Sequence, residues 1–113
     1  MAKSESEVLV GDVVARALAA LRERNLLPSV DLPPVTLVPL EAAQGERGYL
    51  TRIAIEVAQA AEAQDIEHRP AGALAANIAR YLAETVDLVP AYSVIARVEP
   101  DDAGVIHIYL REA

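Results

Sequence analysis

The stretch AGVIHIYLREA, residues 103–113, decides the fold more than any other part of the chain. Apolar residues recur at every second position, which is typical of a β-strand that buries one face. The apolar face consists of three aliphatic residues: Ile106, Ile108 and Leu110. The opposite face consists of Val105, His107, Tyr109 and Arg111. The pattern therefore predicts a strand over 105–112 with a core face and an amphipathic face.

A second strand is predicted directly before this one, over residues 92–99. One face of it would hold Val94, Ala96 and Val98, and the other Ser93, Ile95 and Arg97. Between the two strands lies PDDAG, residues 100–104, whose residue types favour a turn. We therefore expect a β-hairpin, in which Asp101 and Asp102 are turn residues and not a catalytic pair of carboxylates.

Upstream of the hairpin, three segments show the three- and four-residue apolar spacing of amphipathic helices. The predicted helices are residues 7–25, 49–64 and 70–85. VTLVPL, residues 35–40, reads as a short strand, with a proline near its end that suggests an edge position. EAAQGERG, residues 41–48, is predicted to be a polar loop.

The predicted elements follow one another in the order α-β-α-α-β-β. A chain of 113 residues fits one domain, so residues 1–113 are expected to fold as a unit, with 1–6 frayed. Helices that cover one side of a small sheet are the usual solution for such an order. The predicted fold is therefore α+β, with three helices packed on one face of a three-stranded sheet.

The charge of the chain limits its functions. Ten Lys and Arg residues stand against 17 Asp and Glu, which gives a formal net charge of −7. Nucleic-acid binding that depends on diffuse charge needs many basic side chains to neutralise phosphates. The composition therefore argues against that mode of binding and leaves room only for a small local site.

Composition also indicates the compartment. The chain has no cysteine, so it can form neither disulfides nor thiolate metal sites. Its first residues, MAKSESEV, lack the apolar region of a signal peptide, and no run approaches the roughly 20 apolar residues of a membrane span. We expect a cytoplasmic protein without a membrane partner.

No stretch carries a signature of catalysis. The sequence has no glycine-rich phosphate loop and no G-x-S-x-G motif. Its two histidines, His68 and His107, are too few and too far apart to indicate a metal site. We therefore expect a protein that is not an enzyme and that uses neither a metal nor a cofactor.

Two stretches together resemble the N-terminal additional domain of arginyl-tRNA synthetases. They are GYLTRIAIEVAQAA, residues 48–61, and VEPDDAGVIHIYL, residues 98–110. The residues that match are Tyr49, Thr51, Ala54, Gly104, Ile106 and Leu110, with Ile53 a conservative match. Where the family has asparagine in its helix opening and in its hairpin, this chain has Arg52 and His107. The resemblance covers roughly residues 34–112.

The resemblance implies a non-catalytic accessory domain, either standing alone or as a fragment, that contacts the D-loop at the elbow of an arginine-accepting tRNA through its hairpin. The synthetase's nucleotide-binding and anticodon-binding domains are absent from these 113 residues, so aminoacylation by this chain alone is not expected. The asparagine position of the hairpin falls on His107, and a neighbouring outward aromatic position falls on Tyr109.

Two functions follow for the amphipathic face. The first is RNA binding, because loop bases are recognised by stacking on aromatic or arginine side chains. The candidate RNA-binding residues are His107, Tyr109, Arg111 and Arg97. The second is docking of a protein partner or a second copy on a small apolar patch of Val105, Ile95 and Tyr109.

Overall fold

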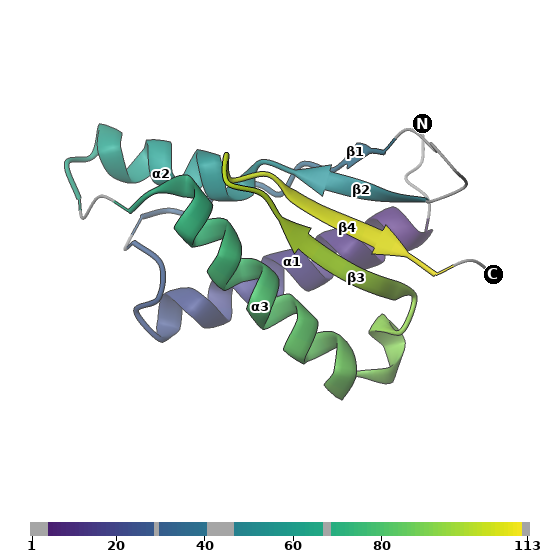
Figure 1. Cartoon of the computed structure of the whole chain (residues 1–113). Helices are drawn as coiled ribbons and strands as arrows, with labels where there is room; N and C mark the ends of the chain where they lie inside the picture. Colours follow the sequence, from purple (N-terminus) through teal and green to yellow (C-terminus); the bar gives the residue numbers. More distant parts are fainter. Residues whose placement is uncertain (1–4, 29, 41–46, 67–68, 112–113) are drawn as a thin grey trace.

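Three α-helices and four strands make up the described parts of the chain, residues 5–28, 30–40, 47–66 and 69–111 of a computed structural model (Figure 1). The helices are α1 (Glu5–Glu23), α2 (Ile53–Ala63) and α3 (Ala71–Leu88). The strands are β1 (Val38–Pro39), β2 (Arg47–Thr51), β3 (Ile95–Pro100) and β4 (Ile106–Leu110). A 3-10 turn, η2 (Pro90–Tyr92), joins α3 to β3. The predicted α+β class is confirmed.

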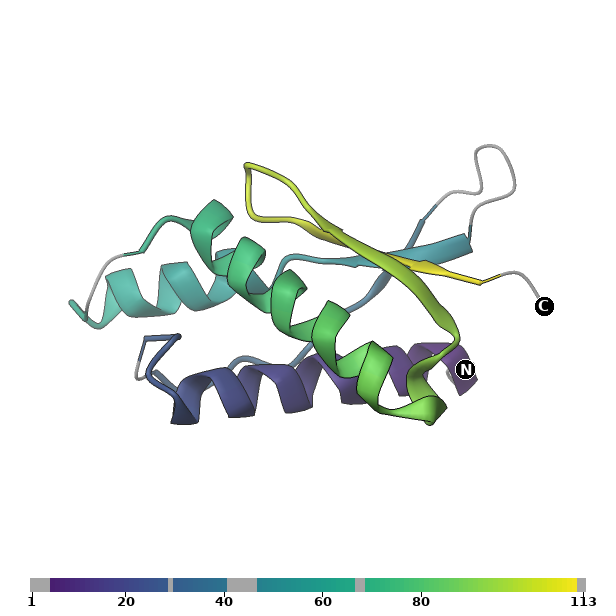
Figure 2. The ribbon, with the colours of Figure 1, turned by 60° about the horizontal axis from the view of Figure 1, so that its bottom comes forward.

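The strands form one antiparallel sheet in the order β1-β2-β4-β3. Strand β4 lies inside the sheet, so its middle residue, Ile108, faces Tyr49 of β2 on one side and Val98 of β3 on the other. Figure 2 shows all three helices on the same side of this sheet. The predicted arrangement of helices on one face is therefore confirmed.

The core between helices and sheet is almost entirely aliphatic, as expected of a chain without Phe or Trp. Each helix contributes a buried stripe of side chains, and the apolar face of β4 covers the core on the side of the sheet. The stripe of α1 contains Val10, Val14, Ala17, Leu18 and Leu21, all of them buried as the spacing predicts. On β4, Ile106 and Ile108 are completely buried. The periodicity of these segments thus gave the correct inward faces.

The sheet has four strands and not three, because Arg47–Thr51 forms β2 where a loop and the start of a helix were predicted. Thr51 ends the strand, and its Oγ1 accepts a hydrogen bond from the backbone N–H of Ile53 at 3.2 Å. That bond satisfies a donor of the first helical turn, as capping side chains do. Helix α2 therefore begins at Ile53, four residues later than the predicted start at Tyr49.

The first predicted strand is also shorter than expected. Of residues 35–40, Val38 and Pro39 form the strand and the backbone N–H of Leu40 donates to the carbonyl oxygen of Gly48 in β2 at 2.9 Å, whereas residues 35–37 are an extended connection. The loop predicted at 41–48 lies mostly outside the described residues, since these resume at Arg47. At the amino terminus, α1 begins at Glu5, so Glu5 and Ser6 are helical and not frayed. Residues 1–4 lie outside the described part.

The predicted hairpin is confirmed, with one change in its faces. A bulge between Ile95 and Arg97 interrupts the pairing of β3 with β4. An extra residue in one strand reverses the side-chain alternation beyond it. As a result Ile95 is buried in the core while Arg97 is exposed on the other side, although both were predicted on one face.

The hairpin turn contains a glycine that no other residue could replace without strain. Gly104 has φ 101°, in the left-handed region, and an added Cβ would lie 2.7 Å from Cβ of Ala71 and 2.9 Å from Cγ1 of Ile55. Glycine adopts this conformation at no steric cost. Gly104 thereby seats the turn against the start of α3 and against α2.

Among the described residues, no helix has the length and apolar character needed to cross a membrane.

Candidate nucleic-acid interface

The side of the sheet away from the helices carries two rows of residues set by the strand register; we call it the open face. The first row consists of Val38, Leu50, His107 and Glu99, which are successive neighbours across the four strands. The second row consists of Gly48, Tyr109 and Arg97. Neighbours in register on one face have Cβ atoms about 4.5–5.5 Å apart, so their side chains interact. Three of the predicted RNA-binding residues are thus brought together here.

Arg97 and Tyr109, directly opposite each other in the second row, form a cation–π contact. The Cζ atom of Arg97 lies 4.0 Å from the centroid of the Tyr109 ring. The guanidinium is also held by a carboxylate, because its Nε donates a hydrogen bond of 3.1 Å to Oε1 of Glu99. The arrangement stacks a planar cation on an aromatic ring and fixes it with a carboxylate.

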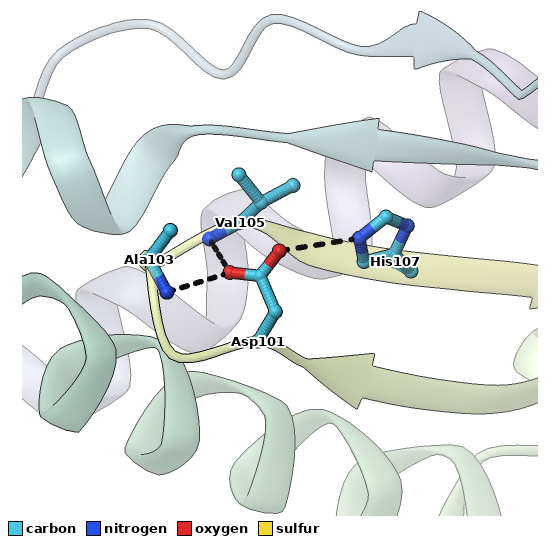
Figure 3. A network of polar contacts seen from close by, with 4 residues as sticks. All are labelled: Asp101, Ala103, Val105 and His107. Carbon is cyan, nitrogen blue, oxygen red and sulfur yellow. Dashed lines mark hydrogen bonds and ion pairs between the residues drawn. The ribbon is translucent and has the colours of Figure 1, made fainter.

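His107 stands beside Tyr109 on the same strand, with its ring in a similar orientation. The two ring centroids are 6.4 Å apart and the ring planes differ by 14°. Nε2 of His107 lies 3.6 Å from Oδ2 of Asp101, which is an ion-pair distance when the imidazole is protonated (Figure 3). His107 therefore links the aromatic part of the open face to the hairpin turn.

Asp101 organises that turn through its other carboxylate oxygen. Oδ1 accepts hydrogen bonds from the backbone N–H groups of Val105 at 2.9 Å and Ala103 at 3.0 Å (Figure 3). The bond from Val105, with smaller contributions from His107 and from the N–H groups of Ala103 and Gly104, holds the pKa of Asp101 below its ordinary value of 3.8. The expectation that Asp101 is a turn residue is confirmed.

Gly48 sets the position of β2 beneath this face. It is opposite Tyr109 in the register, and an added Cβ would overlap the carbonyl oxygen of Ile108. Although it belongs to a row of the open face, Gly48 is buried. A glycine at this point lets the backbones of β2 and β4 approach closely. The Tyr109 side chain is half-buried, with no side chain of residue 48 to compete for its space.

Arg111, the fourth predicted residue, lies apart from the others. Its Nε donates a hydrogen bond of 2.8 Å to the carbonyl oxygen of Ser93, and its backbone N–H donates to the carbonyl of Val94, also at 2.8 Å. These bonds fasten the end of β4 to the start of β3. The described contacts of Arg111 thus hold the two strands together at the end of the hairpin opposite the turn.

The sequence pattern does not indicate four members of the open face: Val38, Gly48, Leu50 and Glu99. Leu50 was predicted in a helix, and Glu99 was not singled out because its register with His107 is invisible in the sequence. The predicted apolar docking patch is wrong in one member, since Ile95 is buried in the core. Of the exposed large apolar side chains, one, Val38 at 48% exposure, belongs to the open face.

The electrostatics of the open face favour stacking over phosphate binding. The charge of Arg97 is offset by Glu99 at 3.1 Å, and Asp101 adds a second carboxylate. Such a surface gives no strong attraction for phosphates. What it offers is two aromatic rings and a guanidinium plane, which recognise unstacked bases.

Within the described residues, no group of three or more His, Cys, Asp and Glu side chains is arranged to hold a metal ion. His68 lies outside these residues.

No protein-family model matches the chain, and searches of the curated proteins and of the solved structures give no significant match.

Proposed function

We propose that the chain is a non-catalytic RNA-binding module whose open face takes up unpaired loop bases, in the manner implied by its resemblance to the N-terminal domain of arginyl-tRNA synthetases. The RNA proposed is the D-loop region of an arginine-accepting tRNA. The observation that carries the proposal is the cluster of His107, Tyr109 and Arg97, three planar side chains in contact on an uncovered sheet face. The module acts in the cytoplasm, in translation.

The residues that match the synthetase domain have structural roles here. The Thr51 hydroxyl accepts a hydrogen bond from the backbone N–H of Ile53, the first residue of α2, and Gly104 allows the hairpin turn. Ile106 and Leu110 are buried. The resemblance thus supports a shared fold, whereas the binding proposal depends on the outward side chains His107 and Tyr109.

The contact between Arg97 and Tyr109 suggests how a base is accepted. A guanidinium 4.0 Å from the ring occupies the place that a stacked base would take on that side of Tyr109. A base arriving there either stacks on the guanidinium or displaces it, and a displaced Arg97 can bind a phosphate of the same nucleotide. Base–aromatic stacking contributes about 1–3 kcal/mol per base.

The test is a titration of a fluorescently labelled arginine-tRNA transcript with the protein at low salt, measured by anisotropy. Removal of the ring in Tyr109→Ala should weaken binding about 5-fold to 150-fold, because one stacked base is lost. Tyr109→Phe keeps the ring and should bind like the wild type. Arg97→Ala should weaken binding and reduce its salt dependence.

Arg16→Ala is the matched control for Arg97→Ala. Arg16 is also an exposed arginine in an ion pair, with Nε 3.0 Å from Oδ2 of Asp12, but it lies on α1. It should leave affinity unchanged apart from the general effect of one charge. Failure of the wild type to bind at low salt overturns the proposal, as does equal binding by wild type and Tyr109→Ala. Self-association without RNA binding, measured on the same sample by light scattering, overturns it as well.

A further inference from the structure

A second candidate site lies on the helical side of the molecule, away from the open face. The end of α1, the turn that follows it and the middle of α3 border an open hollow of about 260 Å³. Its walls are formed by Leu21, Arg24, Leu26, Asn77, Arg80 and Tyr81. Figures 1 and 2 show the two helices crossing beneath the sheet. This hollow therefore shares no residue with the proposed RNA-binding surface.

Arg24 is positioned in this hollow by an aromatic ring and not by a carboxylate. Its Cζ atom lies 5.4 Å from the centroid of the Tyr81 ring, a cation–π contact between the turn that follows α1 and helix α3. Arg24 forms no ion pair with any residue in the described ranges. Its charge thus stays available for an anionic ligand, while the ring limits the directions that its fork of N–H donors can take.

Arg80 supplies a second guanidinium from α3. Its Nε lies 3.7 Å from Oε1 of Glu84, one helical turn further on, and the two side chains are 83% and 64% exposed. Ion pairs this exposed contribute little and exchange readily for other partners. Glu84 also lines the hollow, so its carboxylate competes weakly with a bound anion for Arg80.

A third arginine borders the same place. Arg69 donates from Nη1 to the carbonyl oxygen of Leu26 at 2.6 Å and from Nη2 to that of Asn25 at 3.4 Å. These bonds fix the turn that follows α1, where Asn25 has φ 61°. In a chain of net charge −7, Arg24 and Arg80 therefore line the hollow and Arg69 holds Leu26 of its wall, with Glu84 as the acidic residue of the hollow.

We propose that this hollow binds a phosphate group whose carrier packs on the apolar wall. Two guanidinium forks, from Arg24 and Arg80, match the oxygens of a phosphate with charge-assisted hydrogen bonds. The amide of Asn77 adds a neutral donor. Leu21, Leu26 and the Tyr81 ring form a wall for an apolar or planar group. A free nucleotide and a nucleic-acid backbone share this chemistry.

The experiment follows the arginine Nε–Hε signals of the full chain by NMR during titration with three probes: inorganic phosphate, adenosine 5′-monophosphate and a short single-stranded RNA. The Arg24 and Arg80 signals should shift and saturate with phosphate, while the Arg16 signal should not. Tighter binding of the monophosphate than of the RNA identifies a nucleotide site, and the reverse identifies a backbone site. Adenosine without phosphate should leave both signals in place.

Variants separate this site from a general effect of charge. Arg24→Ala and Arg80→Ala should each weaken phosphate binding at least tenfold, and Arg16→Ala should not change it. Glu84→Gln should strengthen binding about 1.4-fold to fivefold, since an exposed competing ion pair is lost. Tyr109→Ala should bind phosphate like the wild type, which keeps this result independent of the RNA proposal. Absence of saturable shifts at Arg24 and Arg80, or equal binding by Arg24→Ala in a folded state verified by circular dichroism, overturns the proposal.

Discussion

The two faces of strand β4 have different surroundings although their residues alternate along one short stretch. Ile106 and Ile108 are completely buried against the helices. His107 and Tyr109 lie between them in sequence and are half-buried on the open face, where they contact Asp101 and Arg97. Burial of an aliphatic side chain contributes about 1.5–3 kcal/mol to folding, whereas an exposed cation–π contact contributes about 0.5–1 kcal/mol.

The difference shows that one strand of a small domain can serve both folding and ligand binding. The inward residues stabilise the fold and are inaccessible to a ligand. The outward residues contribute little to folding and keep their polar groups available. Substitutions at neighbouring positions of β4 should therefore affect different properties of the protein, and the comparison can be tested residue by residue.

The largest effect is expected from Ile108→Ala. Ile108 is fully buried at the centre of the sheet, so its truncation removes apolar contacts and leaves a cavity. The free energy of unfolding, measured by urea titration, should fall by about 2–5 kcal/mol. Tyr109→Ala is the matched substitution on the open face and should cost less. A larger loss for Tyr109→Ala would contradict the assignment of the two faces.

The next effect concerns the turn that joins the two strands. Gly104→Ala places a Cβ where the backbone has φ 101° and where Ala71 lies within 2.7 Å. We expect the unfolding free energy to decrease by about 1–3 kcal/mol. Gly11→Ala on α1 is the control, because its nearest neighbour would be Cδ1 of Leu37 at 3.9 Å. That variant should gain about 0.4–1 kcal/mol.

A smaller effect is expected for a substitution on the open face that changes RNA affinity. Glu99→Gln weakens the hold on Arg97, whose Nε is 3.1 Å from the carboxylate. Affinity for the arginine-tRNA transcript should rise by about 0.2–1 kcal/mol, because the guanidinium is freed for RNA. Glu62→Gln on α2 removes the same charge from an exposed position and serves as the control. An equal gain in RNA affinity in both variants would show that the effect comes from the change in net charge and not from the release of Arg97.

The smallest effect should appear in acid. Because the folded-state pKa of Asp101 lies below 3.8, its carboxylate stabilises the hairpin at pH values above about 4, and this contribution is lost as the pH falls through the lowered pKa. Asp101→Asn keeps an oxygen acceptor but does not titrate. Its unfolding free energy should therefore depend less on pH between about 5 and 2 than that of the wild type.

Sequence patterns were sufficient for the parts of the fold that depend on local periodicity. The stripe of α1 and the alternation of β4 correctly predict their buried residues, whereas Leu50, which the apolar spacing placed in the second helix, lies in β2 on the open face. Strand β2 escaped prediction because Arg47–Thr51 is short, contains Gly48 and leads directly into an apolar helical pattern. Its identity depends on pairing with β4, which is distant in sequence. Tertiary pairing of this kind overrides local preference.

The candidate site was predictable only in outline. Strand spacing places His107 and Tyr109 side by side, and the structure agrees. The contact of Arg97 with Tyr109 needed the register of the hairpin, which the bulge after Ile95 shifts by one residue. The bulge sets two residues of β3 against one of β4, which is a property of the pairing and cannot be located from the sequence of β3 alone. For the same reason the burial of Ile95 was missed.

The central claim, that β4 folds with one face and binds RNA with the other, is tested most directly by measuring two quantities on two variants. Ile108→Val and Tyr109→Ala are each examined for unfolding free energy and for affinity to the arginine-tRNA transcript. We predict that Ile108→Val lowers stability by about 0.5–1.5 kcal/mol with unchanged affinity. Tyr109→Ala should lower affinity about 5-fold to 150-fold in a protein that remains folded. Unchanged RNA binding by Tyr109→Ala would contradict the claim.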